Sequence, residues 1–234
     1  MNNQTKSMSI FRTHNETLPV VLNLMIANAV VFLATMLFDE RELYTNFALF
    51  NVDLRCIGQE GMTLFQPWQP LTYMFMHGGF SHLFFNMFSL WMFGRTLELE
   101  LGWKRFLIYY MVCGVGAALF QMGIAQIDLS HIEVGTSMWK LYMSTPTVGA
   151  SGAIFGLLLA FGMMHPNAII SLIFPPISMK AKWFVVVYGV LELFLGVSGT
   201  MSGVAHFAHL GGMFWGWLLL LLWRRMDRNR NYYF

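Results

Sequence analysis

Long apolar stretches alternate with short polar segments along this chain. The hydrocarbon core of a bilayer is about 30 Å thick, and a helix needs roughly 17–25 apolar residues to cross it. Measured against that length, the sequence predicts six transmembrane helices and hence an all-α membrane protein. The predicted spans are Leu18–Phe38, Ser81–Leu97, Phe106–Ala125, Thr147–Met164, Trp183–Gly199 and Val204–Trp223.

The composition agrees with a membrane protein and excludes two other classes. Apolar residues make up 56% of the 234 residues and charged residues 11%, against roughly 45–50% and about 25% in soluble domains. No Asp, Glu, Lys or Arg occurs from Leu141 to Met179, a stretch too long to lack charge in a water-soluble fold. The net charge is only +2, whereas nucleic-acid binding needs a dense basic patch. We therefore expect the lipid bilayer as a partner and no nucleic acid.

The distribution of basic residues predicts the orientation in the membrane. Cytoplasmic loops of membrane proteins are enriched in Lys and Arg. With six spans, one side collects eleven of the 14 Lys and Arg residues, and the other side holds only Arg41, Arg55 and Lys140. The prediction is a multi-pass integral protein of a bacterial inner (plasma) membrane with both termini in the cytoplasm. Its parts are a tail over 1–17, a membrane domain over 18–224 and a second tail over 225–234.

Polar side chains inside the predicted spans gather near the outer face. Polar groups are costly in a bilayer, so each one invites a functional explanation. His82 and Asn86 are four residues apart and share one face of the second span. At 1.5 Å per residue from the predicted span starts, Asn86, Ser151 and His209 all lie about 6–8 Å below the outer edge. Three separate helices therefore offer polar groups at one depth.

Small residues indicate how closely two of these helices approach. Helical spacing joins Gly152, Gly156 and Ala160 on the fourth span, and Gly212 and Gly216 on the sixth. Such stripes allow close helix packing in membranes. If the stripes face each other, the Ser151 hydroxyl and the His209 ring come within hydrogen-bonding distance. A serine becomes a good nucleophile when such a base accepts its proton.

The same region contains donors for an oxyanion. Attack on a peptide carbonyl generates a negatively charged oxygen, which needs hydrogen-bond donors already aimed at it. His82, the Asn86 amide and backbone N–H groups beside Ser151 are available for this task. No Asp falls within a predicted span, which favours a Ser–His dyad over a full triad.

Other interpretations of the polar residues fit less well. Four histidines suggest a zinc protease or a metal transporter, but the nearest match to the His-Glu-x-x-His zinc motif is His206-Phe207-Ala208-His209, which has no glutamate. The inverted repeat of broken helices expected of a transporter is not evident. We therefore predict neither a metal nor another cofactor. Glu192 lies near the bilayer midplane in the fifth span, and a structural role is favoured for it over a catalytic one.

Three segments of the chain resemble those of a known family. His77–Asn86, Gly149–Gly152 and Ala208–Gly212 resemble signature segments of the rhomboid intramembrane serine proteases. The resemblance extends from about Trp68 to Gly216, and the three segments occur in order on the second, fourth and sixth spans. It implies a six-transmembrane-helix rhomboid-like bundle with a water-accessible cavity open to the outside.

The resemblance also implies roles for four residues. Ser151 is the implied nucleophile and His209 the implied base, while His82 and Asn86 are the implied oxyanion-hole side chains. Because Ser151 is predicted about 6 Å inside the outer edge, we expect transmembrane protein substrates to be cut near the outer membrane boundary.

Two positions depart from the family pattern. The usual Trp-Arg of the outer loop is Trp68-Gln69, which implies altered anchoring of that loop, and Phe155 replaces a Tyr found in some members but can still pack on His209. The main alternative is a rhomboid-like protein that binds transmembrane clients without cutting them. Such proteins typically lack the serine or the histidine, and this chain keeps both. The sequence leaves the oligomeric state open.

Overall fold

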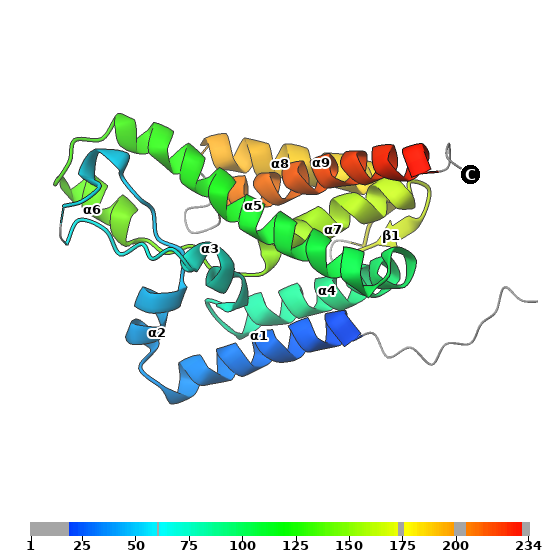
Figure 1. Ribbon diagram of the computed structural model, residues 1–234, viewed down its shortest axis with the longest axis horizontal. Coiled ribbons are helices and arrows are strands. Elements are labelled where there is room, and N and C mark those ends of the chain that lie inside the picture. The colour runs from blue at the N-terminus through cyan, green and yellow to red at the C-terminus, as the bar shows by residue number, and fades with distance from the viewer. Residues whose placement is uncertain (1–18, 60, 173–175, 199–204, 231–234) are drawn as a thin grey trace, which may run out of the picture.

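The computed structural model describes residues 19–59, 61–172, 176–198 and 205–230 (Figure 1). The predicted tail over 1–17, the predicted span starts at Leu18 and Val204 and the predicted span end at Gly199 lie outside these residues. The helices are α1 (Pro19–Leu37), α2 (Glu40–Phe47), α3 (Gln69–Thr72), α4 (Phe80–Leu101), α5 (Trp103–Ser130), α6 (Ser137–Ser144), α7 (Ser151–Met164), α8 (Ala181–Ser198) and α9 (His206–Arg230). Two 3₁₀ turns, η1 (Leu54–Cys56) and η2 (Tyr73–Phe75), and two strands, β1 (Ile169–Ser171) and β2 (Ser178–Lys180), complete the described elements.

Three helices form the centre of the bundle. Among the described elements, α5, α7 and α9 pack against one another most extensively. α1 packs on α4, and α8 packs on both α9 and α7. Figure 1 shows α1 and α4 along the lower side of the view, α8 and α9 along the upper side, and α5 crossing between them. The two helices that carry Ser151 and His209 therefore belong to the most extensively packed part of the bundle.

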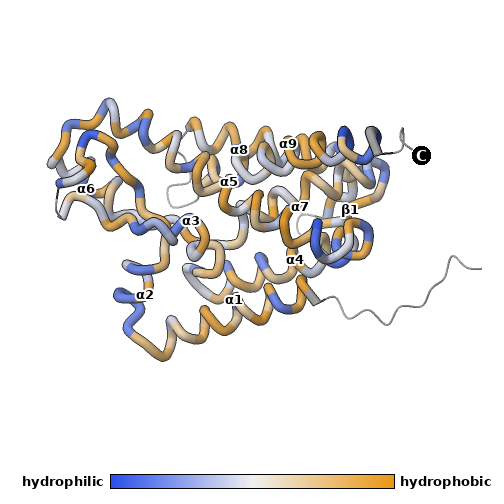
Figure 2. Tube along the Cα trace, in the orientation of Figure 1, coloured by the Kyte–Doolittle hydropathy of each residue, from blue (hydrophilic) through white to orange (hydrophobic). Residues whose placement is uncertain are grey.

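Hydrophobic helices occupy the middle of the molecule, and polar segments gather around α2 and α6 at one end and the end of α9 at the other (Figure 2). Within the described residues, four helical stretches are long and apolar enough to cross a bilayer: Val20–Leu37, Trp103–Ser130, Ala181–Ser198 and His206–Arg228. The 22-residue α4 contains polar residues such as His82, Asn86 and Arg95, and α7 has only 14 residues. The chain is a helical integral membrane protein in which α4, with its few polar residues, and the short α7 pack against other apolar helices.

The predicted start of the fourth span is wrong. Each predicted span overlaps one helix, but α7 begins at Ser151 rather than at Thr147. The backbone of Thr147 exchanges hydrogen bonds of 2.8 and 3.0 Å with Leu49, and the Gly149 N–H donates to the Tyr73 carbonyl at 2.9 Å. Gly149 also has a φ of +122°, a conformation that suits glycine and does not occur in an α-helix. Backbone pairing with the outer loop keeps this segment out of the helix.

A short β-hairpin adds to the predicted helical fold. β1 and β2 pair antiparallel, with Ile169 opposite Lys180 and Ser171 opposite Ser178. The Ala181 N–H donates to the carbonyl of residue 168 at 2.8 Å, so the hairpin runs directly into α8. It forms part of the connection between α7 and α8.

Gln69 anchors the outer loop at the position where the family resemblance led us to expect an arginine. Its side chain is fully buried. The amide nitrogen donates to the carbonyls of Thr45 and Leu64, each at 3.1 Å, and the amide oxygen accepts from the Phe50 N–H at 3.2 Å. A neutral side chain therefore ties the loop that follows α2 to the start of α3.

The helices α7 and α9 touch backbone to backbone. The two predicted glycine stripes face each other: a Cβ added at Gly212 would overlap with the carbonyl group of Gly152, and one added at Gly156 would lie 3.1 Å from the Gly212 carbonyl oxygen. Small residues at membrane helix interfaces allow this kind of approach. The spacing of the two helices sets the distance between side chains on their facing sides.

We predict that Gly212→Ala destabilises the protein by about 1–3 kcal/mol, because the added methyl group forces two packed helices apart. Gly123→Ala in α5 is the matched control, since a Cβ there meets nothing within 4 Å. Thermal unfolding of both variants in detergent should give a lower midpoint for Gly212→Ala alone. Equal midpoints would show that the α7–α9 contact does not depend on glycine.

Candidate active site

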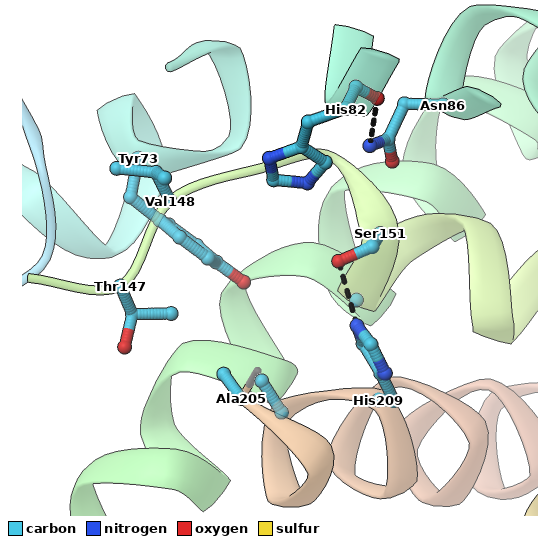
Figure 3. Close-up of a pocket in the computed structure, with 10 residues that line it drawn as sticks. Tyr73, His82, Asn86, Thr147, Val148, Ser151, Ala205 and His209 are labelled. Carbon is cyan, nitrogen blue, oxygen red and sulfur yellow. Dashed lines mark hydrogen bonds between the residues drawn. The ribbon is translucent and has the colours of Figure 1, made fainter. Parts of the chain in front are cut away.

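Ser151 and His209 face each other across the α7–α9 contact. Ser151 is the first residue of α7, and His209 lies one turn into α9. The distance from Ser151 Oγ to His209 Nε2 is 2.8 Å (Figure 3). Ser151 is partly exposed and His209 is buried. At this distance a serine hydroxyl donates to a ring nitrogen that carries no proton.

Phe155 fixes the plane of the His209 ring. The two rings are stacked, with their centroids 4.2 Å apart and an angle of 7° between their planes. Phe155 lies four residues after Ser151, so both side chains project from the same side of α7. The packing proposed for Phe155 from the sequence is therefore present, and it holds the imidazole edge-on to the serine.

The N-terminus of α7 offers backbone donors beside the nucleophile. The first N–H groups of an α-helix have no partner within that helix. The Ile154 N–H is the first one bonded into α7, to the Ala150 carbonyl at 3.1 Å. The late start of the helix thus leaves the amides of Ser151 and Gly152 without a partner within the helix, an arrangement that a helix beginning at Thr147 would not give.

His82 and Asn86 extend from α4 toward the same place. Figure 3 shows both on the opposite side of Ser151 from His209. The Asn86 amide donates to the His82 carbonyl at 2.8 Å, which leaves its second N–H for another acceptor. A Cβ at Gly149 would lie 2.8 Å from His82 Nε2, so the imidazole and the backbone before α7 fit together only with glycine there. The structure therefore brings together all four residues proposed from the sequence.

His77 orders the loop before α4. Its ring is 5.1 Å from the His82 ring in an edge-on arrangement, and its carbonyl accepts from the Tyr44 hydroxyl at 2.8 Å. Burial, together with the neighbouring His82, lowers the pKa of His77 to about 4. His77 is consequently neutral at physiological pH and adds no charge next to the site.

A cavity of about 300 Å³ connects these groups. Tyr73 lines the cavity, but its hydroxyl already donates to the Gly114 carbonyl, at 2.7 Å. The lining residues are Tyr73, His82, Asn86, Thr147, Val148, Ser151, Gly152, Ala205, Ala208 and His209. The serine hydroxyl therefore opens onto this cavity.

Glu192 lies next to the site, although its sequence position gave no reason to expect this. Its Oε2 atom is 2.6 Å from His206 Nδ1 and 3.0 Å from His209 Nδ1. Its depth along the fifth span alone does not predict these contacts. The signal lay in the connection to the next span, because α8 and α9 pack side by side and residues on either side of their connection meet.

The same three side chains are the candidate metal ligands within the described residues. One ligand atom from each of Glu192, His206 and His209 lies within 4.8 Å of the others. Zinc ligands at about 2.0 Å in a tetrahedral shell are about 3.3 Å apart. The two nitrogen–oxygen distances, 2.6 and 3.0 Å, are shorter and correspond to direct contacts between the side chains. The predicted absence of a metal remains a prediction.

A family comparison agrees with this geometry. A model of the Rhomboid domain matches residues 64–226, which include every residue of the candidate site. The chain belongs to the rhomboid family. The resemblance that was inferred from the sequence is thereby confirmed.

Relatives of this rhomboid chain occur in bacteria and plants. Rhomboid protease AarA of Providencia stuartii is 28% identical over 206 residues, which cover 86% of this chain and 70% of AarA. Putative rhomboid protease YdcA of Bacillus subtilis is 30% identical over 159 residues, or 66% of each chain. RHOMBOID-like protein 4 of Arabidopsis thaliana is 32% identical over 154 residues, which cover 66% of this chain and 33% of the plant protein. The chain thus spans only about a third of that plant rhomboid.

We predict that Asn86→Ala lowers kcat by about 10²–10³ without unfolding the protein, because an oxyanion-hole donor acts only in the transition state. Asn28→Ala is the matched control, since Asn28 is buried and makes the same bond to a carbonyl four residues earlier, at 2.7 Å. Steady-state cleavage of a fluorogenic transmembrane substrate gives kcat for both variants, and only Asn86→Ala should lower it. An unchanged kcat for Asn86→Ala would remove this residue from the site.

Proposed function

We propose that this rhomboid chain is an intramembrane serine endopeptidase that cuts transmembrane protein substrates near the outer membrane boundary. The observation that carries the proposal is the 2.8 Å contact between Ser151 Oγ and His209 Nε2 at the edge of the cavity. The relatives named as proteases support the same activity. In this proposal Ser151 and His209 form a catalytic dyad, with His82 and Asn86 in the oxyanion hole.

The proposed reaction uses the dyad twice. His209 Nε2 accepts the Ser151 proton as Oγ attacks the scissile carbonyl carbon. The resulting oxyanion accepts hydrogen bonds from the α7 amides and from the α4 side chains. His209 then gives its proton to the leaving amine, which departs and leaves an acyl ester on Ser151. A water molecule, deprotonated by His209, attacks the ester carbonyl carbon; the bond from this carbon to Ser151 Oγ then breaks, His209 returns the proton to Oγ, and the second product leaves as a carboxylic acid.

The proposed orientation follows from the basic residues. Eleven of the 14 Lys and Arg residues fall on one side of the six spans, so that side is assigned to the cytoplasm together with both termini. The membrane proposed for the chain is a bacterial inner (plasma) membrane. In this orientation the start of α7 and the start of α9 open toward the outer face.

The short α7 supports a cut inside the outer boundary. Its 14 residues rise about 21 Å, which is about 9 Å less than the hydrocarbon core. If α7 ends at the cytoplasmic edge, Ser151 lies about that far below the outer edge. A substrate bond must then be brought to Ser151 from a membrane helix or from the segment that flanks it.

We predict that Ser151→Ala and His209→Ala each remove nearly all cleavage, a loss on the order of 10⁴–10⁶, because neither residue is effective without the other. The double variant should be scarcely worse than either single one. Cleavage of purified single-span substrates, quantified against each variant, gives the three values. Losses that add on a logarithmic scale would show that the two residues act independently. Capture of intact substrate by the native protein without cleavage would support a client-binding function instead.

We also predict that substrates are cut near their outer membrane boundary, with small residues at the cut and helix breakers beyond it. A helical carbonyl is already hydrogen-bonded, so the segment must unwind into the cavity; Gly costs about 1 kcal/mol and Pro about 3 kcal/mol in a helix relative to Ala. Mass spectrometry of the products locates the cuts. Cuts at the cytoplasmic end, or cuts unaffected when the breakers become Leu, would refute the proposed geometry.

A further inference from the structure

A buried carboxylate stands behind the proposed catalytic base. Glu192 projects from α8 and is 8% exposed. Its Oε2 atom is 3.0 Å from His209 Nδ1, while the opposite nitrogen of the same ring, Nε2, is 2.8 Å from Ser151 Oγ. The imidazole therefore lies between the serine and the carboxylate. The absence of aspartate from the predicted spans favours a dyad, but the acid beside His209 is a glutamate, and it comes from α8.

His206 holds the carboxylate in this place. His206 Nδ1 is 2.6 Å from the same Oε2 atom, and both side chains are buried. A charge in a low-dielectric interior is tolerated when it is paired and hydrogen-bonded. One carboxylate oxygen thus faces two imidazole nitrogens, one of which belongs to the proposed base.

The two contacts differ in alignment. The contact between His206 Nδ1 and Glu192 Oε2 has the distance and the angles of a hydrogen bond. The contact between His209 Nδ1 and the same oxygen is short enough for an ion pair but does not have the angles of a hydrogen bond. Coulomb attraction between a carboxylate and an imidazolium needs proximity rather than alignment. The Glu192 contact therefore strengthens when His209 carries a positive charge, which is when the Ser151 proton has moved to Nε2.

We propose that Glu192 is a positioning residue for the Ser151–His209 dyad: its carboxylate keeps the His209 proton on Nδ1, leaves Nε2 free to accept the Ser151 proton, and stabilises the imidazolium that results. The inference rests on the proposed function. Glu192 itself gains and loses no proton. The proton taken from Ser151 stays on Nε2 until it passes to the leaving amine, so Glu192 acts only through His209.

Three contacts then fix the base. Ser151 meets one ring nitrogen, Glu192 meets the other, and Phe155 covers the ring face. Loss of the carboxylate would leave the ring stacked but would permit the tautomer with its proton on Nε2, which cannot accept from serine. A soluble triad loses about 10⁴ in kcat for this reason. Because the His209 Nδ1 contact lacks alignment, we expect a smaller loss here.

The test compares the same substitution at two buried glutamates. Glu192→Gln keeps the size of the side chain and removes its charge. We expect kcat for cleavage of a single-span substrate to fall about 10- to 100-fold with KM unchanged, and Glu192→Asp to recover part of the loss. Glu98→Gln is the control, because Glu98 is also buried, at 4% exposed, and is not part of the candidate site. Its carboxylate accepts from the N–H groups of Val20 and Val21 at 3.0 and 2.9 Å. It should lower the unfolding temperature and leave kcat unchanged.

A second measurement separates positioning from structure. A fluorophosphonate that phosphonylates Ser151 needs the base but no peptide substrate. Its labelling rate should fall with Glu192→Gln in the native background and should not fall further in a His209→Ala background. Three results would overturn the proposal. The first is an unchanged kcat for Glu192→Gln, and the second is an equal fall of kcat in Glu192→Gln and Glu98→Gln. The third is a labelling rate whose losses from Glu192→Gln and His209→Ala add.

Three further outcomes decide the remaining cases. If Glu192→Gln does not fold, proton NMR of the native protein replaces it: the His209 Nδ1 proton should shift downfield when Ser151 is phosphonylated, and no shift would overturn the proposal. Loss of activity in chelator with recovery on added Zn²⁺ would also overturn it, since the three side chains would then be metal ligands.

Full activity of Ser151→Ala would reject the proposed function itself, whereas a fully active Glu192→Gln beside an inactive Ser151→Ala would reject this inference alone.

Discussion

The backbone contact between α7 and α9 is the constraint on which the site depends. Gly152 and Gly212 leave no room for a side chain between the two helices. Ser151 is the neighbour of Gly152, and His209 lies one helical turn before Gly212. Because the contact and the dyad are adjacent, any separation of the helices lengthens the 2.8 Å distance between Ser151 and His209 directly.

A second constraint comes from the bilayer. An unpaired backbone group in lipid costs several kcal/mol, so non-helical backbone is tolerated only where it is buried in protein or lines a cavity. The segment before α7 meets both conditions: Thr147 pairs with Leu49, Gly149 pairs with Tyr73, and the cavity lies alongside. The outer loop therefore permits α7 to begin within the bundle, and the free amides at that beginning become available for chemistry.

The sequence predicted those features that depend on local composition. Apolar length predicted six spans, each of which overlaps one helix, and the small residues at helical spacing predicted the facing surfaces of α7 and α9. The predicted start of α7 was wrong because the true start depends on backbone pairing between Thr147 and Leu49, which lie about a hundred residues apart in the chain. Such pairing leaves no periodic signal in the sequence. The hairpin of β1 and β2 was missed because three-residue strands are too short to show alternation.

The candidate site was predictable only as far as it depends on local sequence. Ser151, His209, His82 and Asn86 each lie on a recognisable segment, and counting residues from the span starts brought them to a common depth. Glu192 was assigned a structural role because its depth was reckoned along one helix. The contacts with His206 and His209 depend on how α8 and α9 fold back on each other, which a residue count along a single span does not contain.

The central claim is that Ser151 is a nucleophile activated by His209. Intact-mass spectrometry and peptide mapping after brief treatment with a fluorophosphonate test it most directly, since the adduct reports the reacting atom without any assumption about the substrate. The account predicts a single adduct on Ser151, formed far more slowly in His209→Ala. An adduct on another residue, or an equal rate of Ser151 modification in the two proteins, would contradict it.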